Sequence, residues 1–138
     1  MPSRIIPTMK YADAPAAIDW LRIAFGFEPH LVVPGPGDTI AHAQLRLGDD
    51  MIMLGSAGDT PFDAMQRPPA GRDAPVTQSA YIVIEDVDGH CDRARRAGAK
   101  IVVEPADQDY GGRLYSCRDP EGHLWNFGSY DPWAEASE

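Results

Sequence analysis

The sequence predicts an α+β fold of two tandem βαβββ modules, whose curved mixed sheets form around a cleft. Three observations support this prediction. The order strand, helix and three strands occurs twice, an offset of 73 residues relates the two copies, and a proline-rich stretch at 56–76 separates them. A module of half this length leaves one sheet face bare until its copy covers it. We therefore expect one domain spanning residues 1–138.

The first module is expected at about residues 3–55. Its first strand, 4–10, contains Pro7, which indicates an edge position or a bulge. Asp13 can cap a helix that Gly26 ends. Three- and four-residue spacing predicts one apolar stripe on this helix, made of Ala14, Ala17, Ile18, Leu21, Ala24 and Phe25. Three strands complete the module, at 28–33, 39–47 and 51–55.

The second module is expected at about residues 77–130, with a tail at 131–138. A strand at 78–84 precedes a helix that Asp86 caps and Gly98 ends. The predicted stripe of this helix is Val87, Cys91, Ala94 and Ala97. Strands follow at 100–104, 113–118 and 123–127, the last two joined by a tight turn at 119–122. The linker at 56–76 shows no periodicity, so we expect a loop with freedom to move.

The offset can be checked at single residues. Adding 73 places the helix cap Asp13 on Asp86, and Gly55 on Gly128. Gly26 falls one residue beyond Gly98, which is a slip of a single position. Matching caps and matching strand ends indicate an internal duplication rather than a chance recurrence of elements.

Composition excludes several classes of partner. With 12 basic and 21 acidic residues the net charge is −9, which disfavours nucleic acid and anionic membranes as partners. The acidity either aids solubility or attracts cationic solutes. No apolar run approaches the roughly 20 residues of a membrane span, and no signal peptide is evident, so a cytoplasmic location is expected. Cys91 and Cys117 lack metal-site spacing and are expected to be reduced, partly buried thiols.

The remaining histidines and tryptophans are interpreted by their places in the pattern. His90 lies off the predicted helix stripe and is expected at the solvated surface, whereas His123 follows a tight turn and is expected to make a polar contact there. Trp20 and Trp125 are expected in the core. Trp133 lies in the tail, where it packs on a module, packs on a partner subunit or is disordered.

Several stretches together resemble a known family. They are the paired modules, the helix Asp13-Ala-Pro-Ala-Ala-Ile-Asp-Trp-Leu-Arg-Ile-Ala-Phe-Gly, the second helix start Glu85-Asp-Val-Asp and the turn Asp119-Pro-Glu-Gly-His-Leu-Trp. They are similar to the vicinal oxygen chelate superfamily, which contains glyoxalases, bleomycin-resistance proteins and extradiol dioxygenases. The resemblance covers nearly the whole chain except the linker, and it implies the fold more strongly than the function.

The resemblance also implies where a metal ion would be held. Enzymes of this family place a His or Gln before each helix cap and a Glu near the end of each last strand. Those positions are Ile6, Met53, Ser79 and Asn126 here, and the pairs obey the same offset. Isoleucine has no lone pair, and a thioether is too soft for the metals usual in this family. We therefore expect no metal and no other cofactor, and whether the protein is an enzyme stays open.

Without a metal, the candidate site is a set of ligand-contacting side chains. The alternation of strand residues gathers Ser79, Tyr81 and Asn126 on one face, and His42 shares a face with Gln44. Arg113 either grips a ligand carboxylate or braces the loop against a nearby acid. No nucleophile or acid–base constellation is evident, so no catalytic residue is assigned. The predicted ligand-binding residues are His42, Met53, Ser79, Tyr81, Tyr110, Arg113 and Asn126.

Three hypotheses follow for function. The first is a small-molecule-binding protein resembling bleomycin-resistance and antibiotic-sequestration proteins, with a hydrophobic or cationic ligand in a metal-free cleft. The alternative is a glyoxalase-type lyase or isomerase, or a dioxygenase, with an altered metal site. The third is a protein-interaction domain with a vestigial cleft. Because members of the family often dimerise, a homodimer is expected.

Overall fold

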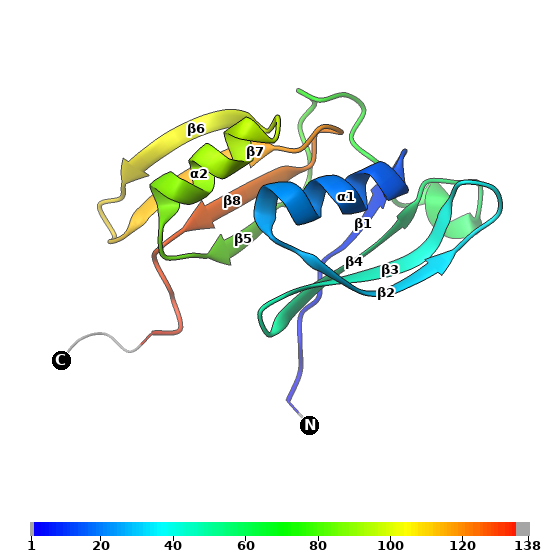
Figure 1. The fold of residues 1–138 in the computed structure, drawn as a ribbon, viewed down its shortest axis with the longest axis horizontal. Coiled ribbons are helices and arrows are strands. Elements are labelled where there is room, and N and C mark those ends of the chain that lie inside the picture. Colours follow the sequence, from blue (N-terminus) through cyan, green and yellow to red (C-terminus); the bar gives the residue numbers. More distant parts are fainter. Residues whose placement is uncertain (1, 135–138) are drawn as a thin grey trace.

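A computed structural model describes residues 2–134 and shows two modules of the same order. The first contains β1 (Thr8–Tyr11), α1 (Ala14–Phe25), β2 (Glu28–Pro34), β3 (Ile40–Leu47) and β4 (Asp50–Ser56). The second contains β5 (Ala80–Val83), α2 (Val87–Arg96), β6 (Lys100–Asp107), β7 (Arg113–Arg118) and β8 (Leu124–Gly128). Figure 1 shows the two sheets beside one another. In this view α2 and α1 lie between β6 at one side of the molecule and β2 at the other.

Each module forms a four-stranded mixed sheet, in the orders β1-β4-β3-β2 and β5-β8-β7-β6. The only parallel pairs among the described strands are β1 with β4 and β5 with β8. Thr8 pairs with Met53 and Tyr81 pairs with Asn126, so the two registers are related by the offset seen in the sequence. The predicted fold class, two tandem βαβββ modules with mixed sheets, is confirmed.

Local signals explain where α1 begins and ends. The Asp13 carboxylate accepts a hydrogen bond from the Ala16 N–H at 3.2 Å, which satisfies one of the free donors of the first turn. Gly26 adopts a φ of 84°, a left-handed conformation that glycine tolerates best, and the helix stops there. All six residues of the predicted stripe are buried, as the spacing predicted.

One hydrophobic core joins the two modules. α1 and α2 contact each other, and each covers the inner face of its own sheet. The Phe25 ring, at the end of α1, lies 4.7 Å from the Phe127 ring and 5.3 Å from the Trp125 ring of β8. Trp125 is fully buried, and Trp20 is half-buried and donates to the Ala97 carbonyl at 2.7 Å, so both tryptophans belong to the core as predicted.

A polar cluster, here called the module joint, links β1 to the β7–β8 turn. Its members are Tyr11, Asp119, Glu121 and Trp125. Asp119 is 1% exposed and accepts hydrogen bonds from the Tyr11 hydroxyl at 2.6 Å and the Trp125 indole at 3.1 Å. The Glu121 carboxylate accepts from the backbone N–H groups of residues 12 and 13 at 2.7 and 2.8 Å. A turn of the second module therefore holds the start of the helix in the first.

The segment between β4 and β5 contacts both modules. It includes a 3-10 helix at Pro61–Ala64. The Gln66 amide donates to the Thr8 carbonyl at 3.0 Å, which satisfies part of the free edge of β1. On the other side, Arg118 donates to the Ala74 carbonyl at 2.7 Å. The linker predicted at 56–76 thus runs over the surface and is attached at both ends.

Two smaller features of the described chain bear on the earlier expectations. Cys91 and Cys117 are both buried and unpaired, as the sequence predicted. None of the helices within residues 2–134 has the length and apolar character needed to cross a membrane.

Candidate functional site

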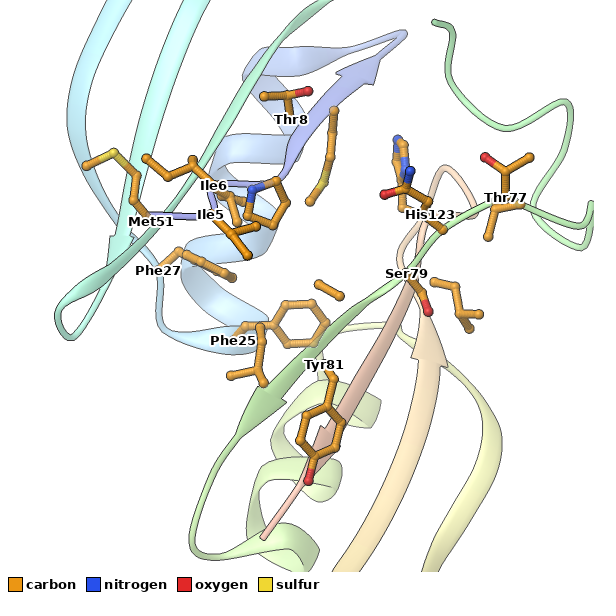
Figure 2. A pocket seen from close by; sticks show the side chains of 18 of the residues that line it. Ile5, Ile6, Thr8, Phe25, Phe27, Met51, Thr77, Ser79, Tyr81 and His123 are labelled. Atoms are coloured by element: carbon orange, nitrogen blue, oxygen red, sulfur yellow. The ribbon is translucent and has the colours of Figure 1, made fainter. Parts of the chain in front are cut away.

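A groove of about 1400 Å³, here called the inter-module groove, lies between the β1 and β5 strands. Both are edge strands of their sheets. The floor includes Phe25 and Phe27, and one wall includes Ile6 and Met51, as Figure 2 shows. Among residues 2–134, its lining includes one carboxylate, Asp50, and one guanidinium, Arg67, besides two histidines. The groove is therefore wide, mostly apolar and close to neutral, which suits a small organic molecule.

A second, smaller hollow of about 180 Å³ lies on the outer face of the first sheet. His42 and Met53 line it, together with Phe62 of the linker. His42 Nε2 lies 3.0 Å from the Gln44 side-chain amide, so these neighbours on β3 share one face, as the alternation predicted. Two predicted ligand-binding residues therefore lie in this hollow and not in the inter-module groove.

The four positions where the family's enzymes carry metal ligands do not present a metal site. Ile6 and Ser79 line the inter-module groove just before β1 and β5, and Met53 and Asn126 occupy equivalent places on β4 and β8. Ile6 offers no donor atom, and the Met53 thioether is a soft ligand unsuited to a hard divalent ion. Within residues 2–134 no group of three or more His, Cys, Asp or Glu side chains is arranged to hold a metal ion. The donor set does not fit the family's metal.

Asn126 is also occupied by other contacts. Its Nδ2 donates to Ser79 Oγ at 2.8 Å and to the Ala80 carbonyl at 3.0 Å. Its Oδ1 accepts from the Ser116 hydroxyl at 2.7 Å. The amide therefore acts as the centre of a hydrogen-bonded row across β5, β8 and β7. Of the predicted ligand-binding residues, Ser79 is the exposed end of this row and Asn126 its middle.

Tyr81 lies on β5, and Tyr110 lies in the loop between β6 and β7. Tyr81 lines the inter-module groove, and its hydroxyl donates to the Tyr130 carbonyl at 2.6 Å. A Cβ atom at Gly128 would lie 2.5 Å from that hydroxyl, so only glycine leaves room for it. Burial, and then the neighbouring Tyr110, raise the pKa of Tyr81. Tyr110 packs edge-on against Tyr130, with ring centres 5.2 Å apart, and does not line the groove.

Arg113 makes ion pairs within the second module. Its guanidinium lies 3.1 Å from Asp88 at the start of α2 and 3.1 Å from Asp107 at the end of β6. Hydrogen bonds to these two carboxylates raise the pKa of Arg113. Of the two roles that the sequence left open, the structure shows the bracing contacts. Arg113 pairs with Asp107, an acid of its own loop region, and also with Asp88 of α2. Arg113 does not line the inter-module groove.

His90 corrects one expectation from the sequence. It was expected at the solvated surface, but its Nδ1 lies 2.6 Å from the Tyr115 hydroxyl and its ring centre 4.2 Å from that of Phe127. Burial, and then the nearby Arg93, lower the pKa of His90 to about 4. It also lines the inter-module groove. The available signal was its spacing of three from Val87, which places it beside the buried stripe of α2.

His123 makes the polar contact expected after a turn. Its Nε2 lies 2.7 Å from the Lys10 carbonyl oxygen, which can only accept, so Nε2 carries the proton. Trp133 is 92% exposed within the described residues, so no packing on either module is seen. Groove residues that the sequence did not single out include Phe25, Phe27 and Ile5, which looked like core or terminal residues in a linear pattern.

The fold and the groove together define a protein of two paired modules with a mostly apolar groove between them. The profile of the Glyoxalase/Bleomycin resistance protein/Dioxygenase superfamily matches residues 8–127. The chain belongs to this superfamily, which confirms the resemblance described from the sequence.

Individual relatives agree with this membership. The chain is 34% identical to TioX from Micromonospora sp. ML1 in a crystal structure, with a TM-score of 0.72, and the match covers 92% of this chain and 98% of TioX. It is 34% identical over 125 residues to an uncharacterised protein of Mycobacterium bovis, covering 88% of this chain and 80% of that protein. A putative glyoxylase, CFP32 of Mycobacterium bovis, is 28% identical over 90 residues, which is 65% of this chain and 34% of CFP32.

Proposed function

We propose that this protein binds an apolar small molecule in the inter-module groove, without a metal ion, and sequesters it without chemical change. The observation that supports the proposal best is the groove itself, with a volume of about 1400 Å³ and an apolar floor. Ligand pockets in proteins are typically a few hundred to about 1,000 Å³, so the groove has room for a large planar ligand. Methionine walls adapt their shape to such ligands.

The class of ligand follows from the family and from the charge. The superfamily's description includes bleomycin resistance proteins, so an antibiotic-like compound is the proposed ligand class. The net charge of −9 raises the local concentration of cations around the protein and lowers that of anions. Hydrophobic compounds that are neutral or positively charged are therefore the preferred ligands. Two free, buried thiols are in keeping with action in a reducing compartment such as the cytoplasm.

A homodimer is part of this proposal. Large apolar side chains on the outermost strands of both sheets are 40–45% exposed; they are Leu31, Val32, Val33, Val102 and Val103. Apolar edge strands that stay open are a liability, and pairing with a second copy of the chain would cover them. Light scattering after size-exclusion chromatography should give twice the 15.1 kDa chain mass, and a monomer at all concentrations would exclude this part.

The experiment for binding is a titration with planar apolar antibiotics, including intercalating and glycopeptide compounds, followed by intrinsic Trp and Tyr fluorescence. The variant Ile6→Asn puts an amide into the groove wall and is expected to weaken binding by about tenfold, because a buried amide loses its water. Ile23→Asn is the matched control, since Ile23 is 53% exposed on α1 and lies outside the groove. No saturable change with any compound would exclude the proposal.

A metal-dependent lyase, isomerase or dioxygenase is the second candidate, favoured by the similarity to the putative glyoxylase CFP32. Elemental analysis after incubation with Ni, Zn, Mn and Fe separates the two candidates. The binding proposal expects no metal retained in stoichiometric amount after gel filtration. One tightly held metal ion per chain would contradict the binding proposal and support the metal-dependent enzyme.

A further inference from the structure

A row of three hydrogen-bonded side chains leads from the core of the second sheet to the inter-module groove. Ser116 is 5% exposed, Asn126 is half-buried and Ser79 is exposed and lines the groove. The three residues come from β7, β8 and the segment before β5, and the distances between successive polar atoms are 2.7 and 2.8 Å. Two of them, Ser79 and Asn126, stand where the family's enzymes carry metal ligands.

The direction of every hydrogen bond in this row follows from one backbone group. The Ala80 carbonyl oxygen can only accept, and it lies 3.0 Å from one terminal atom of the Asn126 amide. That atom must therefore be Nδ2, and the opposite atom must be Oδ1. Since Oδ1 can only accept, the Ser116 hydroxyl must donate to it. The amide orientation is thus determined by the chemistry of its surroundings.

The hydroxyl proton of Ser79 takes part in none of these hydrogen bonds. Nδ2 donates to Ser79 Oγ, so the Ser79 oxygen is the acceptor in that bond and its own O–H points elsewhere. No acceptor for this hydroxyl lies within hydrogen-bond distance in the part of the chain that the structure describes, and water reaches it when the groove is empty of ligand. Successive hydrogen bonds polarise one another, so the donor at the end of the row is strengthened.

The surroundings of Ser79 decide what this donor can recognise. The nearby Tyr81 hydroxyl already donates to the Tyr130 carbonyl, so it does not compete for the same acceptor. His123 donates through Nε2 to Lys10, and so is also engaged. Figure 2 shows Ser79 on the groove wall between Thr77 and Tyr81. The Ser79 hydroxyl is a single neutral donor beside an apolar floor, so it favours an uncharged acceptor on the ligand. A ligand carboxylate would lose several hydrogen bonds to water on entering the groove, and one hydroxyl would replace only one of them.

We propose that Ser79 donates a hydrogen bond to a carbonyl oxygen of the ligand held in the inter-module groove, and that Asn126 and Ser116 act as positioning residues for it. The inference rests on the proposed binding function and narrows the ligand to an apolar molecule with a carbonyl group. In this protein, two positions used elsewhere in the family for metal coordination serve as a hydrogen-bond relay.

The test uses the ketone dye PRODAN and an analogue in which a propyl group replaces its propanoyl group. A hydrogen bond to the PRODAN carbonyl shifts its emission to longer wavelength, so the dye reports the contact directly. Ser79→Ala is expected to weaken PRODAN binding by about five- to tenfold, the usual effect of one hydrogen bond, and to shift the emission of bound dye to shorter wavelength. Binding of the analogue should not change.

Two further variants separate this role from a structural one. Ser79→Thr keeps the hydroxyl and should retain both the affinity and the emission wavelength. Ser3→Ala removes an exposed hydroxyl that lies outside the groove, and should change neither. Circular dichroism on each variant shows whether it is folded, and because Ser79 is exposed its replacement should not unfold the chain.

The outcomes distinguish the inference from the function on which it rests. If both dyes bind the unaltered protein and Ser79→Ala changes both affinities equally, or neither, the hydrogen-bond assignment is wrong while the binding function stands. If neither dye nor any compound of the antibiotic series binds, the binding function and the inference are both wrong. Loss confined to PRODAN, with the emission shift, supports the assignment.

Discussion

Replacing Asp119 by asparagine should destabilise the protein strongly, although the two side chains have the same shape. Asp119 is 1% exposed and accepts five hydrogen bonds. Three come from the backbone N–H groups of residues 121–123, at 3.0–3.1 Å. The other two come from the Tyr11 hydroxyl and the Trp125 indole. An asparagine can direct its oxygen to only one of these groups of donors.

The magnitude can be worked from these contacts. If the asparagine oxygen faces the backbone, its NH₂ group faces the Trp125 indole, which can only donate. One buried donor then loses its partner, and the remaining bonds lose the assistance of a negative charge. Hydrogen bonds to charged groups contribute about 1.5–3 kcal/mol each, so we expect a loss of about 3 kcal/mol in the free energy of unfolding. For a domain of this size that corresponds to a fall in Tm of about 10 °C.

The assay is urea denaturation followed by circular dichroism, with Asp38→Asn as the matched control because Asp38 is exposed. Tyr11→Phe and the double variant complete a cycle. Since Tyr11 and Asp119 are in contact, the double variant should be less destabilised than the sum of the single ones. If Asp119→Asn lies within about 0.5 kcal/mol of Asp38→Asn, the reasoning about the module joint is refuted.

The remaining predictions concern buried titratable groups. The pKa of His90 is lowered to about 4, so the unfolded chain binds a proton near pH 6.5 while the folded chain does not. The contribution of His90 to the free energy of unfolding should therefore be fully present above pH 6.5. It should fall as the pH drops towards 4, by about 2 kcal/mol at pH 5. Denaturation at pH 7 and pH 5 should show this loss in the unaltered protein and in the exposed-site control His30→Gln, but not in His90→Gln. If His90→Gln still loses stability between pH 7 and pH 5, another titratable group causes the pH dependence. Burial raises the pKa of Cys117 to about 12 and also raises that of Cys91. Neither thiol should react with a disulfide reagent such as DTNB at pH 8 until the chain is unfolded, and rapid reaction of either in the folded protein would contradict its burial.

Much of the fold could be predicted because its signals are local. The α1 stripe depends only on spacing along the helix, and all six predicted residues are buried. The caps Asp13 and Asp86 lie within three residues of the N–H groups that they satisfy. Strand ends were less certain, since the strand predicted at 4–10 is observed at Thr8–Tyr11 and that predicted at 100–104 extends to Asp107. Pairing with a neighbouring strand, rather than residue type, decides where a strand stops.

The candidate site was predicted less completely, because contacts between distant residues form it. Ser79 and Tyr81 line the inter-module groove, while His42 and Met53 line a different hollow. Tyr110 and Arg113 lie outside both, and the role of each predicted residue in binding stays a prediction. His90 was misplaced because its burial comes from the rings of Phe25 and Phe127, which belong to other elements.

The sequence by itself determined the duplication, the βαβββ order and the identity of the residues at the four ligand positions. Those features depend on spacing along the chain, which periodicity and helix caps report. Only the tertiary structure decided that Asp119 meets Tyr11, 108 residues away, and that the groove opens between β1 and β5. It also decided the direction of the Ser116–Asn126–Ser79 row. Such contacts follow from how strands and modules lie against one another, and that placement is a property of the whole packed core, which no local pattern contains.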